Sequence, residues 1–250
     1  TFTALRPEQA LSAANSGGGC FLSPTGYEAF RSQSPKLFGL TDHIFSQAAH
    51  SPSTGNGELD RELNRALRIA ANAFGVNPAF GFFDPDKFRD PGVNGINAFA
   101  WHGDVDVPGT RGLVGFGAML FRNELFGYDP TGTSVMCIVA HEFAHNLQWL
   151  RGYHDKIPRL QCELNADFLA GYYLGTRKAK MPTVRVEPAM DLFARLGRAG
   201  GGDPNRTHGN SVERVAAAHS GLRLGYEQRA SLDEAVKAGW ELINYRPGTR

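Results

Sequence analysis

Apolar residues recur along much of this 250-residue chain at helical spacing, and shorter apolar stretches are typical of strands. From residue 58 the apolar positions lie three or four apart until Gly75, which predicts an amphipathic helix over 58–74. Short strands are expected at 79–83, 96–101 and 113–116, and further helices near 189–198, 211–219 and 232–242. The last two helices each begin with a capping-box pattern, Asn210 with Glu213 and Ser231 with Glu234.

The strongest chemical signal is the pentad His141-Glu142-Phe143-Ala144-His145. It follows the apolar run 135–140, and the pattern around it is typical of a helix that crosses a core and ends near Gly152. On such a helix His141 and His145 project from one face about 6 Å apart, a spacing that suits a tetrahedral zinc ion. Glu142 then stands beside the open coordination position as a general base for peptide hydrolysis.

A zinc ion with an open position needs a third protein ligand. Spacing excludes the extended pattern in which a glycine and a third histidine shortly follow the pentad. That pattern requires Gly at 148 and His at 151, where this chain has Gln148 and Arg151. After Pro158 a second helical repeat places Glu163 and Asp167 on one face. Glu163 is therefore the expected third ligand, and Asp167 suits the outward N–H of a bound imidazole, that of His141. The alternative is a solvated acidic face.

Three blocks of the chain, 141–148, 163–167 and 208–215, together resemble gluzincin zinc metallopeptidases of the M48 type and the bacterial neutral zinc metallopeptidases (YpfJ-like). The segment 96–100 is similar to the edge strand of that family, and the resemblance covers roughly residues 58 to 220. It implies one zinc ion per chain at His141, His145 and Glu163, with Glu142 as general base. It also implies a role for His208 or Arg214 near the substrate oxyanion or the acidic groups behind the ligands.

Two of these residues have alternatives in the sequence alone. His208 lies just before a predicted helix start, where backbone N–H groups favour an anion, but from the residues alone a loop histidine facing solvent is preferred. Arg214 is either a surface charge or a partner for Asp167 or Glu213. Both therefore enter the candidate site through the resemblance.

Composition excludes some classes of partner. The chain has 26 Lys plus Arg against 25 Asp plus Glu, a net charge of +1, with no basic cluster interleaved with aromatics, so no nucleic-acid partner is expected. No apolar run approaches the roughly 20 residues of a membrane span. The sequence starts at Thr1 without a signal peptide, and a periplasmic or secreted location after leader removal is favoured over a cytoplasmic one.

Three cysteines allow at most one disulfide and leave the redox compartment open. Cys137 and Cys162 lie on the two zinc-bearing helices and are interpreted as small buried hydrophobes. Cys20 is either a thiol that caps the open zinc position or a free or disulfide-bonded cysteine.

The predicted organisation is an irregular N-terminal arm, residues 1–57, and a metallopeptidase domain, residues 58–250. The expected fold class is α+β and zincin-like, with a small mixed sheet packed on the pentad helix and on a second ligand-bearing helix. The predicted function is zinc-dependent endopeptidase. The alternatives are a zinc-stabilised interaction module with a plugged cleft and hydrolysis of a small amide.

The expected partner is a peptide or protein substrate that adds as a strand to an edge of the sheet, against Asn97, Ala98, Phe99 and Ala100. The sequence leaves substrate identity, latency and oligomeric state open.

Overall fold

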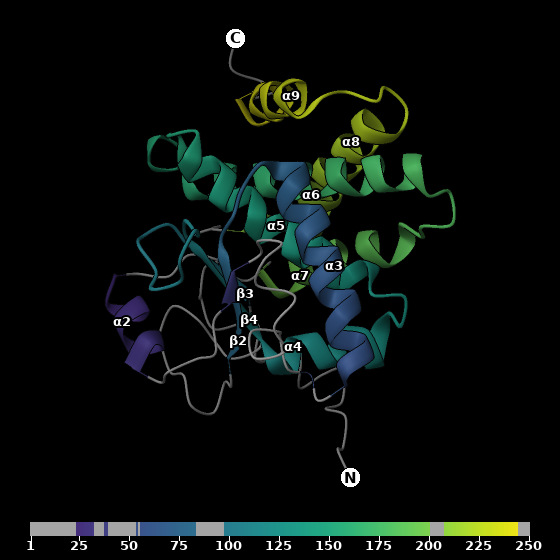
Figure 1. The fold of residues 1–250 in the computed structure, drawn as a ribbon. Coiled ribbons are helices and arrows are strands. Elements are labelled where there is room, and N and C mark those ends of the chain that lie inside the picture. Colours follow the sequence, from purple (N-terminus) through teal and green to yellow (C-terminus); the bar gives the residue numbers. More distant parts are fainter. Residues whose placement is uncertain are drawn as a thin grey trace. The chain divides into compact units, whose positions relative to one another are not determined.

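A computed structural model of the protein describes residues 24–32, 38–39, 54, 56–83, 98–200 and 208–244. The described chain is α+β and mostly helical, with one small mixed sheet (Figure 1). It divides into two compact units, residues 1–130 and 131–250. The boundary predicted between residues 57 and 58 falls inside the first unit.

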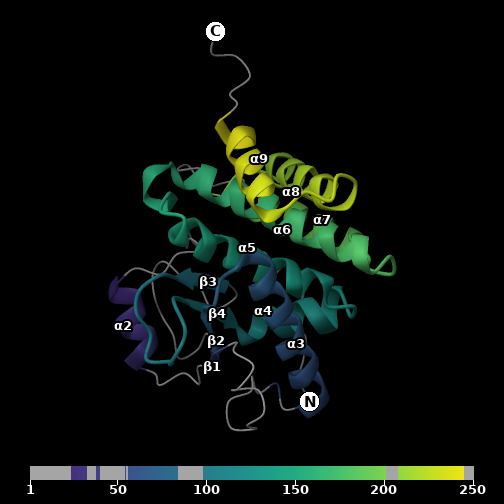
Figure 2. The ribbon, with the colours of Figure 1, turned by 45° about the horizontal axis from the view of Figure 1, so that its top comes forward.

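The sheet belongs to the first unit (Figure 2). Its strands are β1 (Phe38–Gly39), β2 (Ala79–Phe83), β3 (Ala98–Trp101) and β4 (Leu113–Gly117), in the spatial order β1-β2-β4-β3. The central pair β2 and β4 is parallel, whereas the other two pairs are antiparallel. Among the described strands β3 therefore ends the order on one side, in agreement with the edge strand expected there.

The helices of the first unit are α2 (Pro24–Ser32), α3 (Gly57–Phe74), the short α4 (Ala118–Asn123) and the π-helix η2 (Glu124–Tyr128). The prediction for α3 is confirmed, because Gly75 caps its C-terminus with a φ of 62°. At its other end the Asn56 side chain accepts hydrogen bonds from the first free N–H groups. Neither α4 nor η2 was predicted from the sequence pattern.

Helix α2 lies in the segment predicted to be an irregular arm. Tyr27 stacks on Trp101 with ring centroids 4.9 Å apart, and Phe30 meets the Phe99 ring edge-on at 5.2 Å. Both residues are buried, and their spacing of three puts them on one side of the helix. The aromatic contacts with the sheet thus account for a helix that local composition did not indicate.

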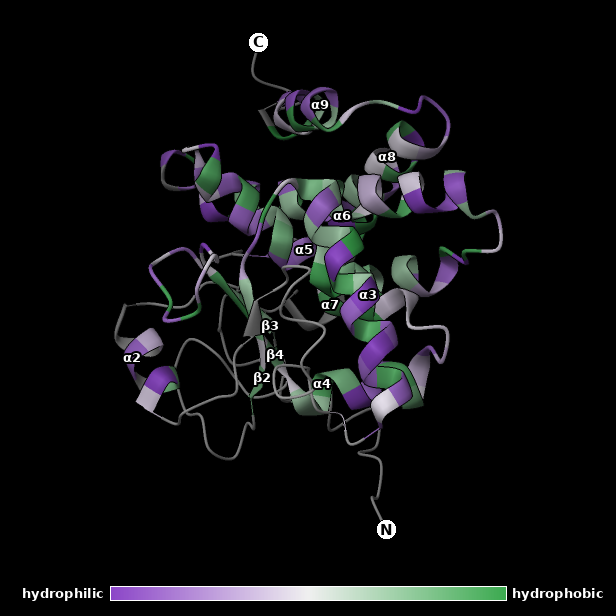
Figure 3. Cartoon of the chain, viewed as in Figure 1, coloured by the Kyte–Doolittle hydropathy of each residue, from purple (hydrophilic) through white to green (hydrophobic). Residues whose placement is uncertain are grey.

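The second unit contains α5 (Thr133–Leu150), the 3₁₀ turn η3 (His154–Lys156), α6 (Arg159–Lys180), α7 (Glu187–Gly200), α8 (Ser211–Tyr226) and α9 (Leu232–Asn244). Helix α6 packs against α5, α8 and α9, and α5 carries mainly apolar residues (Figure 3). Both predicted capping boxes are present, at the starts of α8 and α9. None of the described helices is long and apolar enough to cross a membrane.

Helices α6 and α8 approach each other closely through glycines. A Cβ atom built on Gly171 would overlap the backbone oxygen of Ala218, and one on Gly221 would overlap that of Phe168. Gly175 and Gly225 repeat the arrangement one turn further along each helix. The absence of side chains lets the two backbones meet, and this explains why α8 continues past residue 219, where the sequence analysis expected it to end.

Replacing Gly221 by alanine should destabilise the protein although alanine favours helix. The added methyl group has no room against the Phe168 carbonyl, and such overpacking costs roughly 1–3 kcal/mol. Chemical unfolding of the variant should show a lowered midpoint. His219→Ala, a change at an exposed position of the same helix, should leave the midpoint almost unchanged. Equal midpoints for Gly221→Ala and wild type would contradict this account of the helix pair.

Candidate metal centre

The pentad lies in the middle of α5, where nearly every side chain is buried. The helix ends at Leu150, and Gly152 follows with a φ of 71°, the stop that the sequence pattern predicted. His141 and His145 are four residues apart and so project from the same face. Both imidazoles face a carboxylate of α6 within the same unit.

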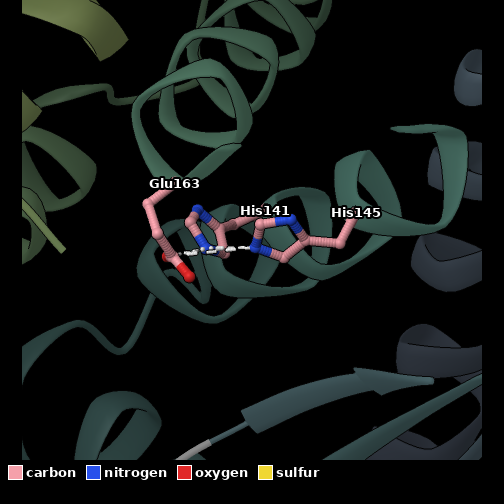
Figure 4. Close-up of side chains that lie close together, drawn as sticks. All are labelled: His141, His145 and Glu163. Atoms are coloured by element: carbon pink, nitrogen blue, oxygen red, sulfur yellow. Dashed lines mark hydrogen bonds and ion pairs between the residues drawn. The ribbon is translucent and has the colours of Figure 1, made fainter. Parts of the chain in front are cut away.

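His141, His145 and Glu163 converge on one point (Figure 4). The Nε2 atoms of the two histidines lie 3.1 Å apart. Oε2 of Glu163 lies 3.3 Å from Nε2 of His141 and 3.9 Å from Nε2 of His145. All three residues are buried, and their candidate ligand atoms lie within 4.8 Å of one another. The structure thus brings together the three residues that the sequence analysis expected to be ligands.

These separations fit a tetrahedral zinc ion. With metal–ligand bonds of roughly 2.0–2.2 Å, neighbouring ligand atoms are about 3.3 Å apart. Two imidazole nitrogens and one carboxylate oxygen are also a common donor set for a zinc site that keeps an open position. The residues present therefore fit the metal that the sequence analysis expected.

The protonation states suit metal binding. Burial lowers the pKa of His145 well below its usual value, and His141 lowers it further, so His145 is neutral. Burial by itself would raise the pKa of Glu163, but His208, His141 and His145 outweigh it and lower this pKa well below its usual range. A neutral imidazole and an ionised carboxylate are the forms that bind a metal.

Asp167 and Arg214 lie behind His141. Nδ1 of His141 lies 2.9 Å from Asp167 Oδ1, on the opposite side of the ring from the converging Nε2 atom. Arg214 donates two hydrogen bonds of 2.8 Å to the two oxygens of Asp167, and both residues are buried. Arg214 is therefore the partner of Asp167 and not a surface charge. Glu213 instead completes the capping box of α8.

Glu142 is buried beside the histidines, and burial raises the pKa of its carboxyl group to about 8. His141 acts in the opposite direction but more weakly. Oε2 of Glu142 has no hydrogen-bond partner among the described residues. A buried carboxyl oxygen without a partner costs free energy, and a ligand or water at this position would remove that cost.

His208 is close to the same cluster. Its Nε2 lies 3.8 Å from Oε1 of Glu163, and its side chain is only 16% exposed. Gly209, with a φ of 73°, turns the chain between His208 and the cap of α8. Burial lowers the pKa of His208. The structure therefore places His208 at the candidate site, where the sequence left a solvent-facing loop as the alternative.

Gln148 was missed as a site residue. Its Oε1 lies 2.9 Å from Nδ1 of His145. Gln148 therefore contacts Nδ1 of His145 in the same way as Asp167 contacts Nδ1 of His141. The available signal in the sequence was a glutamine three residues after a ligand histidine, on the same face of the predicted helix. In the sequence this position served only to exclude a glycine-containing ligand pattern.

The expected substrate-binding residues belong to the first unit. Asn97 lies outside the described residues, whereas Ala98, Phe99 and Ala100 form part of β3 with buried side chains. Cys20 also lies outside the described residues. Cys137 and Cys162 are buried as interpreted, and neither belongs to the metal-ligand group of the described chain.

No protein-family model, curated protein or solved structure matches this chain. The class of site is therefore defined by its own geometry, two histidines and a glutamate that face one point beside a buried glutamate.

Proposed function

We propose that the protein is a zinc-dependent endopeptidase of the gluzincin type, with one zinc ion held by His141, His145 and Glu163. The observation that carries this proposal is the convergence of three buried ligand atoms beside Glu142, a carboxyl group that a purely structural metal site would not need. The two ligand-bearing helices α5 and α6 support a zincin-like fold class.

Bound zinc would act as a Lewis acid and make water nucleophilic near neutral pH. The positive charge of a bound metal would favour the ionised form of Glu142, against the burial that raises its pKa to about 8. Ionised Glu142 accepts the proton of the attacking water and passes it to the leaving nitrogen, so that a peptide bond is hydrolysed. Its buried position keeps bulk water away from this proton transfer.

His141 and His208 have different tasks in this proposal. Asp167 beside Nδ1 of His141 favours a proton at that nitrogen and leaves Nε2 as the ligand atom, while Arg214 compensates the buried charge of Asp167. His208, beside Glu163, is the candidate donor to the oxyanion formed from the substrate carbonyl.

The substrate class proposed is an extended peptide. In the first unit β3 ends the order of the described strands, and an edge strand offers backbone groups to a peptide with little demand on its sequence. Broad specificity towards unfolded polypeptides follows from such recognition.

Cleavage of casein tests the proposal most directly. The zinc-loaded protein should degrade this unstructured substrate, 1,10-phenanthroline should abolish the cleavage, and added zinc should restore it. The non-chelating isomer 1,7-phenanthroline is the matched control and should have no effect. Cleavage that survives complete removal of metal would refute a zinc peptidase, and so would inactivity of the zinc-loaded protein on both casein and short peptide amides.

A further inference from the structure

The buried amide of Gln148 joins the two helices that carry the candidate ligands. Its Nε2 donates hydrogen bonds to the backbone oxygen of Cys162, at 2.9 Å, and to Oδ1 of Asn165, at 3.0 Å, both on α6. Its Oε1 lies 2.9 Å from Nδ1 of His145 on α5. Cys162 directly precedes Glu163, so this one side chain contacts a ligand on α5 and the backbone next to a ligand on α6.

These contacts determine which way the amide points. A backbone carbonyl only accepts hydrogen bonds, so the NH₂ group of Gln148 must face Cys162. The amide oxygen must then face His145, and an oxygen there requires a proton on Nδ1 of the imidazole. Nε2 of His145 is left with its lone pair directed towards Nε2 of His141 and Glu163.

We propose that Gln148 is a positioning residue for the metal centre, which selects the Nδ1–H tautomer of His145 and sets its ring against Glu163. This inference rests on the proposed zinc site. The two histidines are held differently: His141 faces a carboxylate whose charge is compensated by Arg214, whereas His145 faces a neutral amide. A neutral group adds no further negative charge to a pocket that already holds Glu163 and Asp167.

Zinc affinity measured by competition with a chelating indicator provides the test. Gln148→Met keeps the length of the side chain but cannot accept from His145, and loss of such a partner lowers metal affinity about 10- to 100-fold. Gln148→Glu keeps an acceptor at the same place and should bind zinc more tightly than Gln148→Met.

Asn146→Leu is the matched control. Asn146 is also buried on α5, but its amide donates to the backbone oxygen of Glu142, one turn earlier. Its replacement removes a buried polar group whose hydrogen bond goes to the backbone and not to a ligand side chain, and it should change zinc affinity by less than about threefold. Equal losses in Gln148→Met and Asn146→Leu, or wild-type affinity in Gln148→Met, would overturn the positioning role.

The tautomer of His145 gives a second readout that does not depend on zinc. Ring ¹⁵N chemical shifts of the metal-free wild type should show a proton on Nδ1, and this preference should be lost in Gln148→Met. A proton on Nε2 in the wild type would refute the positioning role even if zinc binds. A wild type with the expected tautomer that binds no zinc would instead refute the proposed metal site, and the inferred role towards the metal with it.

Discussion

Replacement of Glu142 by glutamine should lower peptide hydrolysis by at least about a hundredfold while zinc stays bound. Glutamine has nearly the same size and leaves His141, His145 and Glu163 in place, but it cannot accept the proton of the attacking water. General base catalysis contributes about 10²- to 10⁴-fold. Turnover of a peptide that the wild type cleaves, measured beside zinc content, is the direct check.

The control for this change is Glu227→Gln, the same substitution at an exposed residue that follows α8. It should cleave at the wild-type rate. Near wild-type turnover by Glu142→Gln would show that Glu142 is not the base. If wild type and Glu142→Gln both hold zinc and neither cleaves any substrate, a zinc-stabilised interaction module would replace the endopeptidase proposal.

Removal of the His145 imidazole should abolish stoichiometric zinc binding. The wild type is expected to bind about one zinc ion per chain, because three buried ligand atoms meet at the separations of a tetrahedral site. His145→Ala leaves two ligands, so the loss of affinity should exceed the roughly 10- to 100-fold typical of losing a group behind a ligand. Elemental analysis after dialysis measures the bound metal.

His219→Ala is the control, since His219 is an exposed histidine of α8, and it should keep its zinc. Zinc should also stabilise the folded protein, by about 4 kcal/mol when free zinc is a thousandfold above the dissociation constant. Chelation should accordingly lower the unfolding temperature of wild type and leave that of His145→Ala nearly unchanged. Full zinc retention in His145→Ala, or a wild type without stoichiometric zinc, would exclude the proposed ligand set.

Part of the candidate site could be expected from spacing along single helices. His141 and His145 share a face because they are four residues apart, and Glu163 and Asp167 share a face for the same reason. The local backbone hydrogen bonds of the helix are enough to align two such side chains. The contact between these carboxylates and imidazoles depends on the packing of α5 against α6. It could be predicted only because metal sites require a third ligand and a partner for the bound imidazole.

Contacts across long sequence separations were harder to predict. Arg214 reaches Asp167 across 47 residues, and Gln148 reaches Cys162 and Asn165 across 14 and 17 residues. The glycines of α8 are an instructive case, because Gly221 suggests a helix end by its intrinsic preference. In the structure Gly221 lies within α8, where the absence of a side chain allows contact with α6.

The sequence by itself determined the positions of most helices and strands, the caps of α3, α8 and α9, and the pairing of residues on single helix faces. These features follow from hydrogen bonds and side-chain periodicity within a few residues. The tertiary structure alone decided the strand order with its parallel central pair, the burial of α2 against the sheet, the orientation of Gln148 and the partner of Arg214. Each of these depends on which distant surfaces exclude water together, and a local pattern does not contain that information.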